Sequence, residues 1–117
     1  MPEEIDPKVL ALAAQLEVDP SDIEENRDVF TCSEAPGEYA VMTEDERETA
    51  ADQYLENYID ECLLPEMPET ARYYFDHEEW KRDAIMSDGY GHTLASYDGH
   101  EHEQQIDGVW YFIYRTN

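Results

Sequence analysis

Five carboxylates recur at every fourth position of one segment of this chain. They are Glu44, Glu48, Asp52, Glu56 and Asp60. On a helix, residues four apart share a face, and each pair of like charges costs roughly 0.2–0.5 kcal/mol of helix stability. Four residues of helix rise about 6 Å, close to the phosphate spacing along one nucleic-acid strand. The row therefore predicts a surface that presents anions as a phosphate backbone does.

The same row predicts the effect of a charge reversal. An ordinary solvated helix face alternates acids with lysines, whereas this segment contains one cation, Arg47. If Asp52 and Glu56 became lysine, repulsive pairs four residues apart would become attractive. We expect the helix to gain stability and the binding of a basic partner to weaken.

His92, His100 and His102 form a second group, one with metal-binding chemistry. They lie close together in the sequence, beside Asp98 and Glu101. In a strand, His100 and His102 point to the same face, and two imidazoles with a carboxylate are suitable ligands for zinc. Short histidine-rich tracts often match such patterns by chance. We expect solvated histidines here, with no bound metal and no other cofactor.

Catalytic motifs are missing from the sequence. It contains no phosphate-binding glycine loop, no GxSxG and no HExxH. Cys32 and Cys62 have acidic neighbours, which oppose thiolate formation, and they show no disulfide spacing. Carboxylates are so numerous that a pair of them carries no specific signal for acid–base chemistry. We expect a binding protein rather than an enzyme, with reduced thiols in the cytoplasm.

The charge of the chain restricts its partners. Its 117 residues include 30 Asp and Glu against 7 Lys and Arg, a formal net charge of −23. Direct binding to nucleic acid requires clustered cations, and an anionic membrane would repel the chain. With 41% hydrophobic and 12% aromatic residues, the sequence is nevertheless too apolar for a disordered tail. We expect a single folded domain over residues 1–117 with a basic protein as its partner, and no signal peptide or membrane span.

Helix signals occur in three places. Helices are expected at about 7–17, 43–63 and 76–87. Thr43 with Glu46, and Asp76 with Glu79, have the spacing of capping boxes. Gly89 and Gly91 are expected to end the third helix.

Strand signals flank these helices. Strands are expected at about 29–31, 39–42, 101–106 and 109–115, and residues 93–97 are expected to be extended. Asp107-Gly108 between two strand-like runs is a strong hairpin signal. The last run is apolar almost throughout, which places it centrally in the sheet. The predicted fold is α+β, with one antiparallel sheet of three to five strands and helices packed on one face.

A single core is expected around the aromatic residues. Leu55, Tyr58 and Trp80 should be buried with Phe112 and with Trp110 or Tyr111. Strand alternation places Trp110 and Phe112 on one face and Tyr111 and Ile113 on the other.

The second half of the chain resembles the end of the ArdA-type antirestriction proteins. The matching residues, within about 73–115, are Tyr74-Phe75-Asp76, Trp80-Lys81-Arg82-Asp83, Asp107-Gly108-Val109-Trp110-Tyr111-Phe112 and Arg115. The whole chain also resembles small acidic bacteriophage proteins of unassigned function. ArdA-type proteins are longer, acidic mimics of DNA that occupy restriction enzymes. The resemblance implies the same strategy here, with no catalytic residue. It adds four acids to the partner-binding set: Asp76, Glu78, Glu79 and Asp83.

Together these patterns favour an acidic nucleic-acid mimic. The hypothesis is a phage or mobile-element anti-defence protein that inhibits a basic nucleic-acid-binding host protein in the host cytoplasm. A restriction enzyme or a CRISPR effector is the type of target expected. Two alternatives remain: a non-catalytic housekeeping or structural domain of a salt-adapted organism, and a small metal-binding module that uses the histidine segment.

Overall fold

The structure is a computed structural model that describes residues 5–117. The elements in chain order are α1 (Pro7–Leu16), the 3₁₀ turn η1 (Pro20–Asp22), β1 (Ile23–Asn26), β2 (Val29–Cys32), β3 (Ala35–Met42), α2 (Glu44–Tyr58), the π-helical turn η2 (Ile59–Leu63), the 3₁₀ turn η3 (Leu64–Glu66), α3 (Glu69–Tyr73), α4 (His77–Leu94), β4 (His102–Ile106) and β5 (Val109–Arg115).

The strands form one antiparallel sheet in the order β1-β2-β3-β5-β4. This confirms the α+β class and the five-strand upper bound of the prediction. The apolar strand β5 lies between β3 and β4, inside the sheet as expected, and the turn between β4 and β5 falls at Asp107-Gly108. The sequence did not predict the edge strand β1. It has only one buried residue, Ile23, and so lacks the alternation of apolar and polar residues that identifies a strand.

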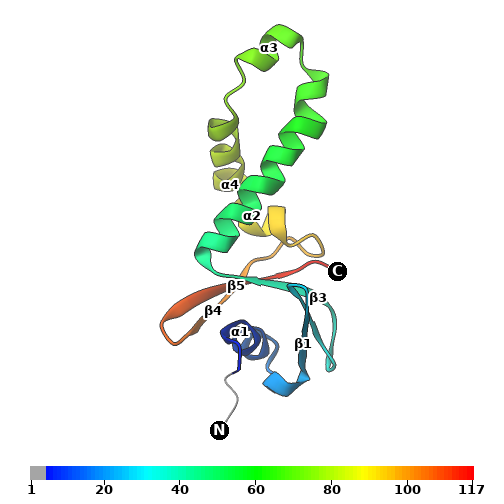
Figure 1. Cartoon of the computed structure of the whole chain (residues 1–117), viewed down its shortest axis with the longest axis vertical. Helices are drawn as coiled ribbons and strands as arrows, with labels where there is room; N and C mark the ends of the chain where they lie inside the picture. Colours follow the sequence, from blue (N-terminus) through cyan, green and yellow to red (C-terminus); the bar gives the residue numbers. More distant parts are fainter. Residues whose placement is uncertain (1–4) are drawn as a thin grey trace.

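Helices cover both faces of the sheet, and the predicted one-face packing is wrong. On one face, Leu12 of α1 packs in a cluster with Phe30, Tyr111 and Ile113. On the other face, a second cluster forms around Tyr114, below α2 and the end of α4 (Figure 1). Because β5 carries large apolar residues on both of its sides, each face of the sheet needs its own cover.

The segment between β3 and β4 projects from the sheet as a helical hairpin (Figure 1). We call residues 44–94 the arm and the rest of the described chain the sheet body. The molecule measures 62 × 28 × 23 Å along its principal axes. The arm begins with the predicted capping box, in which Thr43 Oγ1 accepts from Glu46 N–H and Glu46 Oε1 accepts from Thr43 N–H. The long first helix continues into η2 and η3 and ends at residue 66.

The second helix of the arm runs further than the sequence suggested. Asp76 caps its start by accepting from Glu79 N–H, but the described contacts do not include the return bond from Asp76 N–H to the Glu79 side chain, so the predicted capping box is only half formed. Gly89 has non-helical angles (φ 79°, ψ 172°), but helix resumes as far as Leu94, so the expected extended segment 93–97 is wrong. Gly91 permits this last turn, because a Cβ there would lie 2.6 Å from the carbonyl oxygen of Gly99.

The expected single core is divided in two. Leu55, Tyr111 and Phe112 are buried, whereas Tyr58 and Trp110 are 42% and 47% exposed. Tyr58 instead stacks on Trp80 within the arm, with ring centroids 5.8 Å apart. Alternation along β5 is as predicted, with Tyr111 and Phe112 in different clusters. Tyr58 and Trp80 lie on the projecting part of the arm and pack on each other, whereas Tyr90 of α4 packs against the second cluster of the sheet body.

Arg47 ties the arm to the sheet body. Its guanidinium lies between the rings of Tyr90 and Phe112, 4.1 and 3.8 Å from their centroids. Its Nη1 donates to Glu101 Oε2 at 3.2 Å, and the same carboxylate oxygen accepts from the Tyr114 hydroxyl. One network therefore joins α2, α4, the segment before β4, and β5.

This network makes a prediction about alkaline stability. Burial, and then the hydrogen bond to the Glu101 carboxylate, raise the pKa of Tyr114. A raised pKa adds stability that is complete below the ordinary tyrosine pKa of about 10 and is lost as the pH rises beyond it. Replacing Tyr114 with phenylalanine should cost about 1 kcal/mol at neutral pH and should reduce the further loss at alkaline pH. Urea denaturation at neutral and alkaline pH measures both.

Tyr97 provides the control, because it is 58% exposed. The Tyr97→Phe variant should follow the wild-type pH profile. If Tyr114→Phe and wild type lost the same stability between neutral and alkaline pH, Tyr114 would not be the titrating group.

Candidate functional site

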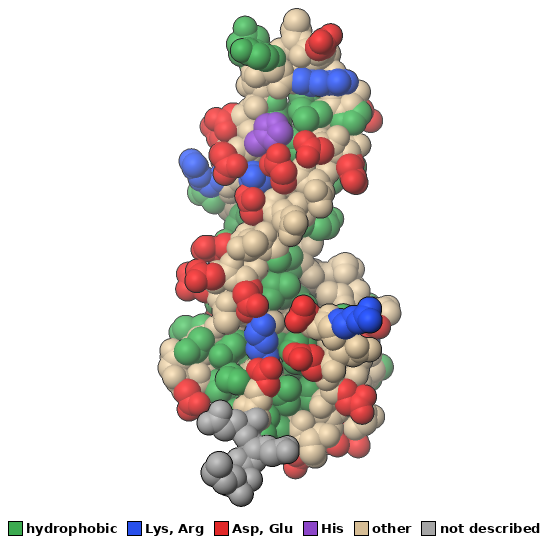
Figure 2. Space-filling model, in the orientation of Figure 1, with side chains coloured by type: hydrophobic (Ala, Val, Ile, Leu, Met, Phe, Trp, Pro, Cys, Tyr) green, Lys and Arg blue, Asp and Glu red, His purple; other side chains and the backbone are tan. Residues whose placement is uncertain are grey.

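The acids predicted to bind a partner all lie on the arm, but they differ in environment. Glu44 and Glu48 on α2, and Glu79 and Asp83 on α4, are exposed and take part in no salt bridge among residues 5–117. The acids are accessible along the length of the arm (Figure 2). These four carboxylates are available to a partner without breaking an internal ion pair.

The middle of the predicted row is neutralised by a cation from the other helix. Lys81 Nζ lies 2.8 Å from Asp52 Oδ1, 3.1 Å from Glu56 Oε2 and 3.0 Å from Glu78 Oε1. The Lys81 side chain is only 7% exposed. The hydrogen bond to Asp52 is the largest of several that raise the pKa of Lys81. We call these four residues the lysine cluster.

The lysine cluster overturns the stabilisation expected from charge reversal at Asp52 and Glu56. Lysines at these two positions would place two more ammonium groups beside the buried Lys81, instead of the carboxylates that it binds. The sequence suggested unrelieved repulsion because the compensating cation lies on α4. Reversal of Asp52 and Glu56 should therefore destabilise the arm.

A mixed group of donors lies next to the lysine cluster. His77 Nδ1 is 2.9 Å from Glu56 Oε1, and the His77 ring packs against Phe75 with centroids 5.3 Å apart. Asp60, in the π-helical turn, brings a second carboxylate: ligand atoms of Glu56, Asp60 and His77 all lie within 4.8 Å of one another. Hydrogen bonds from Lys81 and then from His77 lower the pKa of Glu56.

Sequence reasoning missed His77. The three histidines that it singled out, His92, His100 and His102, are exposed. The rings of His100 and His102 have centroids 6.5 Å apart, while His92 lies on α4 beside an aromatic hollow lined by Tyr54. The histidine with carboxylates around it follows the second capping residue, Asp76. Its partners become visible only once the two helices of the arm are paired.

The remaining reactive groups do not converge on one site. Cys32 is buried in the sheet body and Cys62 is exposed in the arm, and both are free thiols. Asp76 serves as a helix cap through Glu79 N–H. The groove between α2 and α4 is lined by both charged and apolar side chains: Glu48, Ala51, Asp52, Leu55, Glu78, Lys81, Arg82, Ile85, Met86 and Tyr90. Its chemistry suits contact with a charged surface.

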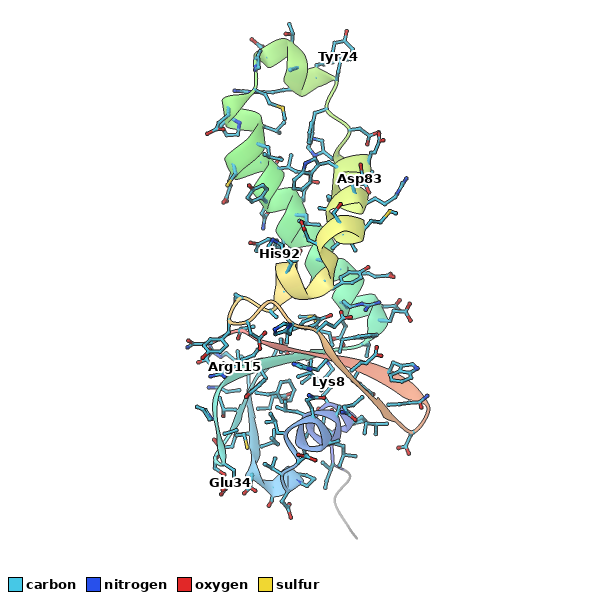
Figure 3. All side chains as sticks on the ribbon, turned by 180° about the vertical axis from the view of Figure 1, so that it is seen from behind. Lys8, Glu34, Tyr74, Asp83, His92 and Arg115 are labelled. Atoms are coloured by element: carbon cyan, nitrogen blue, oxygen red, sulfur yellow. The ribbon has the colours of Figure 1, made fainter. Side chains whose placement is uncertain are left out.

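The far end of the arm carries two exposed aromatic side chains. Tyr73 and Tyr74 are 84% and 83% exposed, and their rings contact each other edge to face at 5.3 Å. Arg72 holds this tip together by donating to the carbonyl oxygens of Met67 and Pro65 at 3.0 and 3.1 Å. Figure 3 shows Tyr74 at the tip and Asp83 further down the arm on α4.

Comparison with protein-family models, with curated proteins and with solved structures gives no match. Among the described helices, none combines the length and the apolar character that crossing a bilayer would require.

Proposed function

We propose that this protein is an acidic nucleic-acid mimic that uses its arm to occupy the binding site of a basic, nucleic-acid-binding protein. The observation that carries the proposal is the excess of unpaired carboxylates on an elongated body. Within residues 5–117, salt bridges involve only five carboxylates, whereas 28 of the 30 Asp and Glu of the chain lie in this range. A site that attracts phosphates would attract this surface in the same way.

The internal ion pairs support this interpretation. Lys8 binds Glu46, Arg47 binds Glu101, and Lys81 binds three carboxylates. These cations stabilise the fold and leave little positive charge to offset the acids outside the pairs. Glu44, Glu48, Glu79 and Asp83 thus form the exposed acidic set of the arm.

The tip supplies a second reason to place the partner on the arm. Tyrosine is enriched among the residues that contribute most to protein interfaces, because it buries a large rigid surface and retains a polar end. Tyr73 and Tyr74 contribute little to the core at 84% and 83% exposure. We propose that they anchor the arm in the partner while the carboxylates contact its cations. The target class is a restriction enzyme or CRISPR effector of a host that a phage infects.

The test is to neutralise acids that do not serve the fold. Glu48→Gln, Glu79→Gln and Asp83→Asn leave the lysine cluster intact. If each lost contact is worth about 0.5 kcal/mol, the triple variant should bind the partner about tenfold more weakly. The affinity should also depend less steeply on salt. Partner captured from host lysate with wild-type protein is purified, and its affinity for each variant is measured across a salt series.

The matched control removes the same charge from the sheet body. Glu24, Glu25 and Glu34 are exposed, and their replacement by glutamine changes the net charge equally. This control should keep wild-type affinity, and duplex DNA should displace the wild-type protein from its partner. Equal losses in both triple variants would indicate a general effect of net charge rather than contacts made by the arm. A partner that DNA does not displace would contradict mimicry.

A further inference from the structure

The donor group at the end of α2 has the composition of a metal site. Glu56, Asp60 and His77 each offer one ligand atom, and these atoms lie within 4.8 Å of one another. Metal–ligand bonds of about 2.0–2.2 Å place neighbouring ligands roughly 3–4 Å apart, so small side-chain rotations would close the set. We propose that these three residues bind one divalent first-row transition cation such as Zn²⁺.

The side chains around the donors already orient two of them. Lys81 Nζ binds Glu56 Oε2, so the other oxygen, Oε1, faces His77 at 2.9 Å. Phe75 packs against the His77 ring. Metal ligands in proteins are usually held in this way by neighbouring groups, and such neighbours strongly affect affinity. The exposed His100 and His102 pair has no comparable support among the described contacts.

The local charge favours a cation despite the nearby ammonium group. Lys81 is shared among Asp52, Glu56 and Glu78, so it does not neutralise all three. Asp60 adds a further carboxylate without a salt bridge in the described part of the chain. A cation at the Oε1 side of Glu56 would therefore meet a net negative environment.

The backbone gives an independent observation at the same place. Asp60 belongs to the π-helical turn Ile59–Leu63, which continues directly from the end of α2. Such turns are rare and occur often at functional sites. The imidazole nitrogen selects a transition metal over Ca²⁺ or Mg²⁺, which prefer oxygen ligands.

The experiment uses the full chain and zinc chloride in chelator-free buffer, followed by isothermal titration calorimetry. One equivalent of zinc should bind. Asp60→Asn and His77→Gln should each weaken zinc binding at least about tenfold, and Ca²⁺ should not compete. Asp60 is exposed, so its amide variant should fold, which circular dichroism checks. The matched control is the double variant His100→Gln with His102→Gln, which should bind zinc as wild type does.

Three results would overturn the proposal. The first is an absence of zinc binding to the wild-type chain. The second is binding that survives both Asp60→Asn and His77→Gln but is lost in the His100 and His102 control. The third is equal affinity of the chain for Ca²⁺ and Zn²⁺, since that would indicate a diffuse attraction of cations to the acidic surface. The result does not depend on the proposed decoy function, because no partner is present.

Discussion

Replacement of Arg47 by methionine is expected to lower the free energy of unfolding by about 3 kcal/mol, because it breaks a largely buried ion pair. The Arg47 side chain is 14% exposed and that of Glu101 is 28% exposed. Methionine retains apolar contact with the Tyr90 and Phe112 rings, so the decrease in the free energy of unfolding measures mainly the effect of the missing charge. Glu101 keeps only its bond from Tyr114 among the side-chain partners described here. Urea denaturation followed by circular dichroism measures the effect.

A second substitution separates the charge from the packing. In the Arg47→Met background, Glu101→Gln removes the unpaired charge and should restore part of the lost stability. In the wild-type background the same substitution should destabilise, because Arg47 then loses its partner. If Glu101→Gln had the same effect in both backgrounds, the two residues would not be coupled.

Replacement of Lys81 by methionine is expected to cost about 2 kcal/mol of stability. The estimate lies below the range for fully buried pairs because the three carboxylates are partly solvated and can regain water. Their side chains are 58%, 37% and 77% exposed for Asp52, Glu56 and Glu78. Thermal and urea unfolding should show the loss.

The neighbouring arginine is the control for Lys81. Arg82 is exposed and forms no salt bridge among the described residues, so Arg82→Met should change stability by less than about 0.5 kcal/mol. If Lys81→Met were as mild as Arg82→Met, the lysine cluster would not hold the arm together. Binding of the partner should not weaken in Lys81→Met, because the substitution leaves every carboxylate in place.

Local signals predicted most of the elements. A capping box at Thr43, a cap at Asp76 and an Asp-Gly turn each depend on residues only a few positions apart, and all three occur in the structure. The alternation of β5 was also readable, because it follows from strand geometry. The extension of α4 beyond Gly89 could not be predicted from the sequence, because it depends on Gly91 packing against a loop that lies later in the chain.

Only part of the candidate site could be predicted from the sequence, because its residues come together only when two helices pair. The acids of α2 were visible as a row, but Lys81 and His77 lie on α4, and nothing in their local sequence shows which carboxylates they meet. That the exposed acids form a binding surface remains a prediction. Tyr73 and Tyr74 could be identified as aromatic, but whether they were buried depended on the direction of the arm.

The position of the arm in the chain affects how a partner could accept it. The arm leaves the sheet after β3 and returns before β4, so it is an outgrowth from one face of the sheet body rather than part of the sheet itself (Figure 1). Two paired helices are slender, on the order of 20 Å across with side chains. A channel that admits a nucleic-acid duplex has a comparable width. If the proposed function holds, the arm would enter such a channel while the broader sheet body stayed outside and limited the depth of insertion.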